Sequence, residues 1–394
     1  MFEELTPQPP DKIIALLQMF RADQRPGKID LGVGVYRDAE GRTPVMRAIK
    51  AAEERLWREQ ESKSYKALLG DADFIAGMRS LVLGDAVPIE RVAGAQAPGG
   101  TGALHLLFEL TGKAGAGGTI WISDPSWPNH AAMLKHLGMP YRSYRYFDEA
   151  TRDLDREGMF TDLAEAGRGD VVLLHGCCHN PTGANLTPDD WARVTDLALS
   201  QGFTPMIDFA YQGFGDGLDA DAAGVRAMAA RVPEITIAAS CSKNFGVYRD
   251  RVGAALVVCA DAERAELAAD NLASLNRVNY SFPPDHGATA VTMVLTDPAL
   301  RADWEAELEE MRNRMLRLRE GLAEALRRET NDDRFDFIAR HRGMFSRTGA
   351  SPEQVTRLRE EFGIYMVGDG RINVAGLPDD GLDEIAKAMV AVGL

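Results

Sequence analysis

The sequence lacks the features of a secreted or membrane-spanning protein. It has four cysteines in 394 residues, too few for the dense disulfide framework of a small secreted domain. No apolar run is long enough to span a bilayer. The first residues, Met1 to Leu5, carry acids instead of the basic segment and apolar core of a secretory signal. We therefore expect a cytoplasmic protein with no membrane partner.

The chain also has fewer basic than acidic residues. The chain has 44 Lys and Arg against 59 Asp and Glu, which gives a formal net charge of -15 at pH 7. A protein that binds nucleic acid needs a basic face that displaces counterions from the phosphate backbone. The charge balance argues against a nucleic-acid partner, while local arginines can still bind small anions.

Strand-like and helix-like segments alternate through the middle of the chain, which predicts the α/β class. Expected strands begin near residues 119, 141, 171, 204 and 235, and helical patterns such as Trp191 to Ser200 separate them. Strands that alternate with helices form right-handed crossovers and a mostly parallel sheet. The segment Arg251 to Ala260 follows the previous strand too closely for a crossover, so we expect it to return antiparallel.

The two ends of the chain are expected to form a smaller domain. A short strand is expected around Ile29 to Val35, and apolar residues recur at helical spacing from Trp304 to Leu326, which predicts one long helix. We expect residues 1–43 to form an amino-terminal arm and part of the small domain. Residues 44–300 would form the large domain, and residues 301–394 the long helix and the rest of the small domain.

Lys243 is the candidate nucleophile. It lies in the run Ser240 to Gly246, directly after an apolar segment, and Arg251 follows shortly downstream. A lysine at a strand end can form an imine with a phosphorylated aldehyde cofactor, while Ser240 and Arg251 hold the phosphate. Ser240-x-x-Lys243 also fits serine hydrolases in which lysine activates serine, but their Ser-Asp-Asn and Lys-Thr-Gly elements are missing from this sequence.

Polar residues also follow two other expected strands. The strand near residue 171 leads to Asn180-Pro181-Thr182-Gly183, and the strand near residue 204 leads to Asp208, with Tyr211 close behind. Ligands in open α/β sheets bind at the carboxyl ends of strands. An aspartate beside a pyridine nitrogen keeps that ring protonated, and Asn180 and Tyr211 can bond the ring's phenolic oxygen. These residues predict pyridoxal phosphate.

Two further motifs suit such a cofactor. The turn Gly99-Gly100-Thr101-Gly102 opens an expected helix, and backbone amides at a helix start bind phosphate. It lacks the full spacing of a dinucleotide site and the lysine of a P-loop. Trp127, in the segment Asp124 to His130, offers a surface on which a flat ring can stack. The alternative for Trp127 is a core side chain between two prolines.

The segment His175-Gly176-Cys177-Cys178-His179 raises the question of zinc. In a strand, His175, Cys177 and His179 would share one face. Against this, no Cys-x-x-Cys or His-x-x-x-His partner occurs elsewhere, and an unpaired cysteine is commonly a small buried hydrophobe. We expect no metal.

Together these segments resemble the class I aminotransferases of fold type I, in particular the bacterial aspartate and aromatic-amino-acid subgroup. The matching segments span nearly the whole chain in the family's order: Leu31 to Tyr36, Gly99 to Gly102, Asp124 to His130, His175 to Gly183, Asp208 to Tyr211, Ser240 to Gly253, Asn279 to Pro284 and Arg371 to Asn373. The resemblance implies a large domain with a mostly parallel seven-stranded sheet flanked by helices, and a smaller α+β domain. It also implies pyridoxal 5'-phosphate and a homodimer with shared active sites.

The resemblance implies a role for each matching residue. The catalytic group would be Lys243, Asp208 and Tyr211, with His130 and His175 as support behind Asp208. The cofactor-binding residues would be Tyr65 from the other subunit, Gly100, Thr101, Trp127, Asn180, Asp208, Tyr211, Ser240, Lys243 and Arg251. The substrate-binding residues would be Gly34, Trp127, Asn180, Arg277 from the other subunit, and Arg371, which would hold the α-carboxylate.

The resemblance implies a transaminase that moves amino groups between aromatic or acidic L-amino acids and 2-oxo acids by a ping-pong mechanism. Arg277 would meet a side-chain carboxylate. Phe282 stands where strict aspartate enzymes of the family commonly carry asparagine, which resembles the dual-specificity aromatic members. If Phe282 only packs beside Pro283 and Pro284, the alternative is a strict aspartate aminotransferase. A non-catalytic protein that keeps the fold, or another pyridoxal enzyme such as a lyase, would be further alternatives.

Overall fold

The chain divides into two compact units. The computed structural model describes residues 1–7, 11–115 and 117–394. Unit 1 comprises Met1–Arg42, Met315–Arg340 and Met344–Leu394, and unit 2 comprises Thr43–Arg314 and His341–Gly343. Each unit has its own apolar core.

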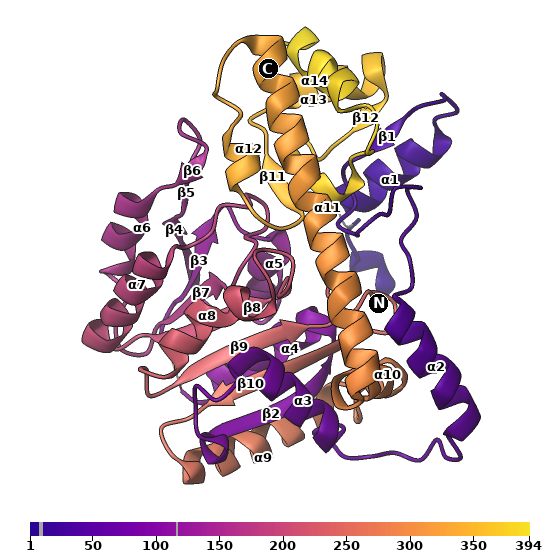
Figure 1. The fold of residues 1–394 in the computed structure, drawn as a ribbon. Coiled ribbons are helices and arrows are strands. Elements are labelled where there is room, and N and C mark those ends of the chain that lie inside the picture. The colour runs from indigo at the N-terminus through magenta and orange to yellow at the C-terminus, as the bar shows by residue number, and fades with distance from the viewer. Residues whose placement is uncertain (8–10, 116) are drawn as a thin grey trace. The chain divides into compact units, whose positions relative to one another are not determined.

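A seven-stranded sheet forms the centre of unit 2, with the strand order β2-β10-β9-β8-β7-β3-β4 (Figure 1). Its strands are Val92–Pro98 (β2), Ile120–Asp124 (β3), Tyr141–Arg145 (β4), Val171–His175 (β7), Thr204–Phe209 (β8), Ile235–Ser240 (β9) and Val252–Val258 (β10). β10 runs antiparallel to both of its neighbours, whereas the other paired strands run parallel. The α/β class, the seven-stranded sheet and the antiparallel return are therefore confirmed.

Helices cover both faces of this sheet, which explains why every residue of β7, β9 and β10 is buried. On one face, a single core joins the sheet to α4 (Gly99–Lys113), α5 (Pro128–His136) and α9 (Ala262–Asn279). On the other face, a Cβ added to Gly94 of β2 would lie 2.5 Å from Ile75 of α3 (Ala72–Leu83).

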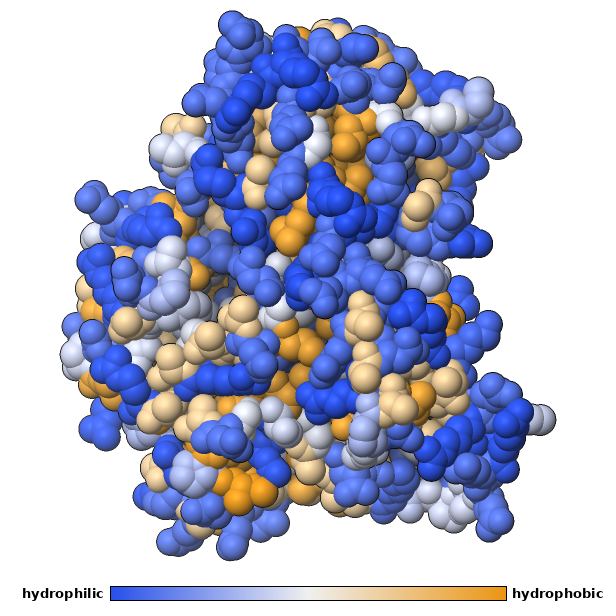
Figure 2. Space-filling view, viewed as in Figure 1, coloured by the Kyte–Doolittle hydropathy of each residue, from blue (hydrophilic) through white to orange (hydrophobic). Residues whose placement is uncertain are grey.

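The remaining elements of unit 2 lie beside these layers. They are α2 (Arg47–Glu59), the hairpin of β5 (Phe147–Asp148) and β6 (Asp153–Leu154), α6 (Arg156–Leu163), α7 (Pro188–Gln201), α8 (Leu218–Ala229) and α10 (His286–Thr296). α8 contacts both α3 and α7, and α10 contacts α2 and α3. Hydrophilic residues cover most of the face shown in Figure 2, in line with the excess of acids.

The long helix α11 (Pro298–Thr330) is divided between the units after Arg314. In unit 2 its Trp304 donates a hydrogen bond to the carbonyl oxygen of Asn244 at 2.7 Å and stacks on Phe245, with ring centroids 4.3 Å apart. These contacts explain why the first part of the helix belongs to unit 2. The expected domain boundary at residue 300 falls inside that unit.

Unit 1 combines short strands and helices around the second core. β1 (Ile29–Asp30) pairs in parallel with β12 (Ile364–Tyr365), and β11 (Phe345–Arg347) pairs antiparallel with β13 (Arg371–Asn373). The helices are α1 (Lys12–Ala22), α12 (Phe337–Arg340), α13 (Pro352–Phe362), α14 (Leu382–Ala391) and the second part of α11. This is the expected α+β composition. No helix in the described ranges is long and apolar enough to cross a bilayer.

The strand expected over Ile29 to Val35 is wrong beyond Asp30. The Oδ1 atom of Asp30 accepts a hydrogen bond from the backbone N–H of Gly32 at 2.9 Å, which turns the chain out of the strand. Asn373 then donates from Nδ2 to the carbonyl oxygens of Val33 and Val35, at 2.7 and 2.8 Å. The backbone of Leu31 still bonds to Tyr365 and Asn373, and beyond it the side chain of Asn373 holds the segment.

Candidate active site

The carboxyl ends of neighbouring strands bring three of the expected residues together. His175, the last residue of β7, pairs in register with Asp208 of β8. Tyr211 follows β8, Lys243 follows β9, and the Lys243 Nζ atom lies 5.2 Å from the centroid of the Tyr211 ring. The positive charge of Lys243 also acts on Asp208. The sheet edge therefore assembles Lys243, Asp208 and Tyr211 from segments that are far apart in sequence.

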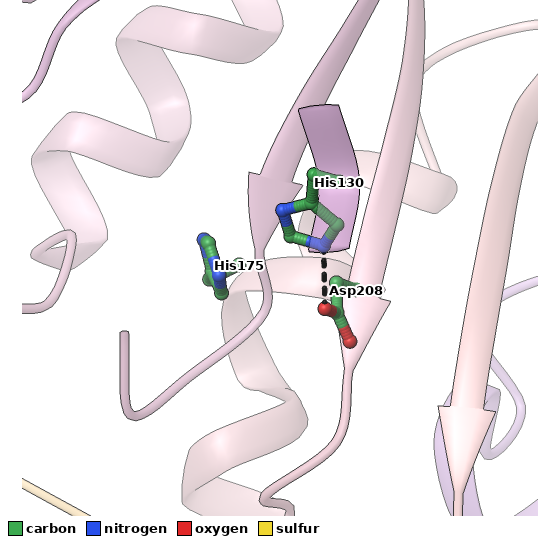
Figure 3. A group of neighbouring side chains, drawn as sticks. All are labelled: His130, His175 and Asp208. Carbon is green, nitrogen blue, oxygen red and sulfur yellow. Dashed lines mark hydrogen bonds and ion pairs between the residues drawn. The ribbon is translucent and has the colours of Figure 1, made fainter. Parts of the chain in front are cut away.

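Asp208 is a buried carboxylate held by His130 (Figure 3). His130 Nε2 lies 2.9 Å from Asp208 Oδ2, and His130 Nδ1 lies 2.9 Å from Ser126 Oγ. Burial raises the pKa of Asp208, but the hydrogen bond and charge of His130, with smaller effects of His175 and Lys243, outweigh it, so the pKa lies below its ordinary value. Asp208 is therefore ionised at neutral pH and suited to hold a protonated ring nitrogen.

Two more histidines lie behind this pair. The ring of His175 is 5.3 Å from that of His130 and 4.1 Å from that of His179, centroid to centroid. Burial lowers the pKa of His175 to about 3, and it also holds the pKa of His179 well below its ordinary value. Neither ring nitrogen of His175 has a hydrogen-bond partner in the described part of the chain. His175 and His179 are therefore neutral at pH 7, and the hydrogen-bond donor to Asp208 is His130.

The strand-face argument for zinc is wrong. β7 ends at His175, and Cys178 has a φ of 51°, so His175, Cys177 and His179 do not alternate along one strand. The possible ligand groups within the described residues are His130, His175 and Asp208, and separately Cys177, Cys178 and Asp221. In the first group, His130 Nε2 is already engaged by Asp208. In the second, burial raises the pKa of Cys177 well above its ordinary value, which disfavours the thiolate that binds zinc.

Lys243 is more easily deprotonated than an ordinary lysine. Burial lowers its pKa from 10.5 to about 8, with Asp208 acting to raise it and Arg251 acting to lower it. At pH 7 this leaves about a tenth of the amine neutral, roughly 300-fold more than for an unperturbed lysine. The neutral amine is the form that attacks an aldehyde.

A second cluster surrounds the start of α4. A Cβ added to Gly99 would lie 2.6 Å from Arg251 Nη2, and one added to Gly100 would lie 3.0 Å from Ser240 Cβ. Arg251 Nη1 also lies 3.5 Å from the hydroxyl oxygen of Ser242. A helix start, two serine hydroxyls and an arginine are donors that suit a phosphate dianion. Ser242 was not among the expected site residues, although its place in the run Ser240 to Lys243 marked it as a neighbour.

Thr101, Trp127 and Asn180 come from loops and helix starts around these clusters. Thr101 lies in the first turn of α4 and lines a surface groove together with Arg251. Trp127 precedes α5 and lies edge-to-face on His130, with centroids 5.2 Å apart. Asn180 is buried and precedes Pro181 across a cis peptide bond.

The serine-hydrolase alternative finds no support in this geometry. Ser240 Oγ accepts a hydrogen bond from the backbone N–H of Ser242 at 3.2 Å, and among the described residues none joins it to Lys243. Instead, Lys243 interacts with Asp208 and with Arg251. An amine with a carboxylate at one end and a phosphate cradle at the other fits a phosphorylated pyridine aldehyde.

Gly34 and Arg371 lie together in unit 1. The Nη2 atom of Arg371 donates to the carbonyl oxygen of Gly32 at 2.9 Å, and its guanidinium lies 4.4 Å from the ring centroid of Phe345. A Cβ added to Gly34 would lie 3.0 Å from the same ring. Phe345 was not among the expected site residues, because its contact with Arg371 depends on the β11–β13 pairing.

Tyr65 and Arg277 lie on the surface of unit 2. The Tyr65 side chain is 80% exposed and stacks on Phe282, while Arg277 is exposed and donates a hydrogen bond to the hydroxyl of Ser281. Within the described ranges, no hydrogen bond joins either of them to Lys243 or Asp208. The structure does not bring these two residues into the cluster around Lys243.

Comparison with known proteins gives consistent matches over the whole chain. Residues 26–389 match the family model described as Aminotransferase class I and II. The aromatic-amino-acid aminotransferase of Paracoccus denitrificans is 57% identical over 394 residues and 100% of both chains, and the aspartate aminotransferase of Escherichia coli K12 is 44% identical over 395 residues and 100% of both chains. A solved aromatic-amino-acid aminotransferase from Burkholderia pseudomallei, covalently bound to pyridoxal phosphate, is 41% identical with a TM-score of 0.97, covering 100% of this chain and 99% of that one.

The opposing effects of Asp208 and Arg251 on Lys243 can be tested in the cofactor-free protein. We expect the reactivity of Lys243 toward an amine-modifying reagent to rise with a midpoint near pH 8. Asp208→Asn should move this midpoint down, because the carboxylate raises the lysine pKa, and Arg251→Gln should move it up. The midpoint is read from peptide mapping across a pH series, with Arg251→Lys as the charge-conserving control. Shifts of the same sign in the two variants would contradict this electrostatic arrangement.

Proposed function

The chain belongs to the class I and II aminotransferases, and from this premise we propose a pyridoxal-phosphate-dependent transaminase that acts on aromatic and acidic L-amino acids and their 2-oxo acids. The observation that carries the proposal is the position of Lys243, which has a lowered pKa and interacts with both Asp208 and Arg251. A non-catalytic protein of the same fold would not explain the lowered pKa of Lys243, and a lyase would not explain why the similar proteins are named aminotransferases. We also propose a cytoplasmic location, to which four buried cysteines without a disulfide are suited.

Each expected site residue of unit 2 has a physical role in this proposal. Bound pyridoxal phosphate supplies an electron sink that stabilises negative charge at the substrate Cα. Lys243 would hold the cofactor through its amine, and the same amine would carry the proton away from the substrate Cα. Asp208, kept ionised by His130, keeps the ring nitrogen protonated. Tyr211 and Asn180 bond the phenolic oxygen, and Trp127 covers the ring.

The charged groups of the cofactor and the substrate require separate anchors. Gly100, Thr101, Ser240 and Arg251 hold the phosphate through amide, hydroxyl and guanidinium donors. In unit 1, Arg371 binds the substrate α-carboxylate beside Gly34, because a planar guanidinium meets a carboxylate with two parallel hydrogen bonds. The ring of Phe345 lies against the guanidinium of Arg371, which supports this orientation of Arg371.

We propose a homodimer in which Tyr65 and Arg277 of each chain serve the active site of the other. Both side chains are exposed, and neither is engaged by the Lys243 cluster of its own chain. Tyr65 then donates to the phosphate, and Arg277 pairs with the side-chain carboxylate of a dicarboxylic substrate. Aromatic substrates require Arg277 to turn aside, because an unpaired buried guanidinium costs several kcal/mol.

The attachment of the cofactor to Lys243 is testable by chemical trapping. Borohydride reduction of the purified protein followed by peptide mapping should label Lys243. Lys243→Ala should fold but lose turnover by at least about a thousandfold, because the same amine holds the cofactor and moves the proton. Lys135→Ala, at an exposed lysine of α5, is the matched control and should keep both the label and the activity. A label on any other lysine would refute the assignment.

The shared active site predicts complementation between two inactive variants. Mixing Lys243→Ala chains with Arg277→Ala chains should restore part of the activity on dicarboxylic substrates. In such a hybrid, the site that keeps Lys243 receives an intact Arg277 from the other chain. Activity is followed with aspartate after exchange of subunits, and unmixed variants are the controls. A monomer in sedimentation at micromolar concentration would exclude the shared site.

Dual specificity is tested by comparing kcat/KM for aspartate and phenylalanine. We expect both to react, and we expect Arg277→Ala to lower the value for aspartate by roughly 100-fold or more, because two charge-assisted hydrogen bonds are lost. The value for phenylalanine should change by less than about tenfold. A preference of the unaltered enzyme for aspartate beyond about ten-thousandfold, some 5.5 kcal/mol, would instead identify a strict aspartate aminotransferase.

A further inference from the structure

Two distant segments of unit 2, residues 65–71 and 276–286, are held together, and we call them the paired segments. Asn276 donates from Nδ2 to the carbonyl oxygen of Leu68 at 2.8 Å. Gln96 of β2 bridges the two segments, since its Nε2 donates to the carbonyl oxygen of Pro284 at 2.6 Å and its Oε1 accepts from the backbone N–H of Asp71 at 3.1 Å. The paired segments are therefore fixed to the sheet and to each other.

The base of the paired segments is buried and closely fitted. Gln96 and Asn276 are both almost fully buried. Gly70 has a φ of +93°, and a Cβ there would lie 2.4 Å from Gln96 Cβ, so the chain can only approach Gln96 this closely at a glycine. At the surface, Lys66 Nζ lies 3.1 Å from Asp285 Oδ1, which adds an ion pair across the same two segments. The exposed side chains of the paired segments are therefore attached to a backbone that buried hydrogen bonds hold in place.

On this base the rings of Tyr65 and Phe282 stack. Their centroids are 4.5 Å apart and their planes differ by 14°. Tyr65 is otherwise 80% exposed, and its hydroxyl makes no hydrogen bond within the described part of the chain. Phe282 is half-buried, and its backbone N–H donates to the carbonyl oxygen of Tyr280 at 2.8 Å. Phe282 is therefore the better-held ring of the pair and supplies the surface against which Tyr65 rests.

We propose that Phe282 is a positioning residue that fixes the Tyr65 ring, so that its hydroxyl is presented to the cofactor phosphate of the other subunit. This inference rests on the proposed dimeric transaminase. It gives Phe282 a different task from substrate contact, because Tyr65 stacks on one face of its ring. A held ring loses less conformational entropy on binding phosphate than a free surface tyrosine does.

Arg277, in the last turn of α9, contacts the residue next to Phe282, so its role requires a separate measurement. Ser281, next to Phe282, has a φ of 68° and accepts the hydrogen bond from Arg277. A substitution of Phe282 that disturbs the whole turn would therefore change the handling of a side-chain carboxylate. A substitution that only frees Tyr65 would change retention of the phosphate and leave the KM for aspartate near its original value.

The test measures how fast pyridoxamine phosphate leaves the dimeric enzyme after dilution, because that form of the cofactor has no covalent bond to Lys243. We expect Phe282→Leu to speed release about fivefold, which corresponds to about 1 kcal/mol. Phe282→Tyr keeps a ring and should stay within about twofold of the unaltered enzyme. Phe282→Met is a second ring-free variant in case the leucine form does not fold. Sedimentation confirms that each variant remains dimeric.

The double variant shows whether Phe282 acts through Tyr65. Tyr65→Leu should speed release at least as much as Phe282→Leu, and adding Phe282→Leu to it should have no further effect. A full effect of Phe282→Leu in the Tyr65→Leu background would overturn the positioning role. Unchanged release with an altered ratio of kcat/KM for phenylalanine and aspartate would return Phe282 to substrate contact. Failure of the proposed function would appear separately, as an unaltered protein with no cofactor on Lys243.

Discussion

The hydrogen bond from His130 to the buried Asp208 is the interaction on which the rest of the site depends. Burial disfavours the charged form of this carboxylate and by itself raises its pKa. The hydrogen bond and charge of His130, with smaller effects of His175 and Lys243, outweigh burial and lower the pKa. His130 is in the first turn of α5 and Asp208 is near the end of β8, so one contact joins the helix that begins after Trp127 to the centre of the sheet.

The same carboxylate helps to set the chemistry of the lysine. Burial and the charge of Arg251 favour the neutral amine of Lys243, whereas the charge of Asp208 favours its protonated form. The balance places its pKa near the physiological range instead of far above or below it. A site that holds a phosphate dianion at one end and a pyridinium at the other needs a cation, Arg251, and an anion, Asp208. These two charges also act in opposite directions on the pKa of Lys243, so the residues that bind the cofactor also set the reactivity of the amine.

Much of the fold and part of the site were predictable from the sequence, because they depend on local patterns. Apolar runs followed by polar residues located the ends of β7, β8 and β9, and helical periodicity located α11. The extent of β1 was not predictable, since it ends where the side chain of Asp30 replaces a backbone partner. The zinc hypothesis assumed a strand through Cys177, but β7 stops at His175. Phe345 was missed because its contact with Arg371 exists only after β11 and β13 have paired. Ser242 was missed although it lies beside Lys243, because its contact with Arg251 depends on how the segment between β9 and β10 folds back.

Tyr65 and Phe282 illustrate the same limit most clearly. More than two hundred residues separate them, and no periodicity relates one to the other. They meet because Gln96 and Asn276 bind the backbones of both segments, and those two side chains are buried by the sheet and α9. From the sequence, Phe282 was interpreted as a substitution within a motif that indicates aromatic substrates, with packing beside Pro283 and Pro284 as the alternative. In the structure its partner is another aromatic ring on the surface. In the proposed dimer, this aromatic pair would fix the Tyr65 hydroxyl relative to the sheet of its own chain, so Phe282 would affect cofactor binding without touching the cofactor.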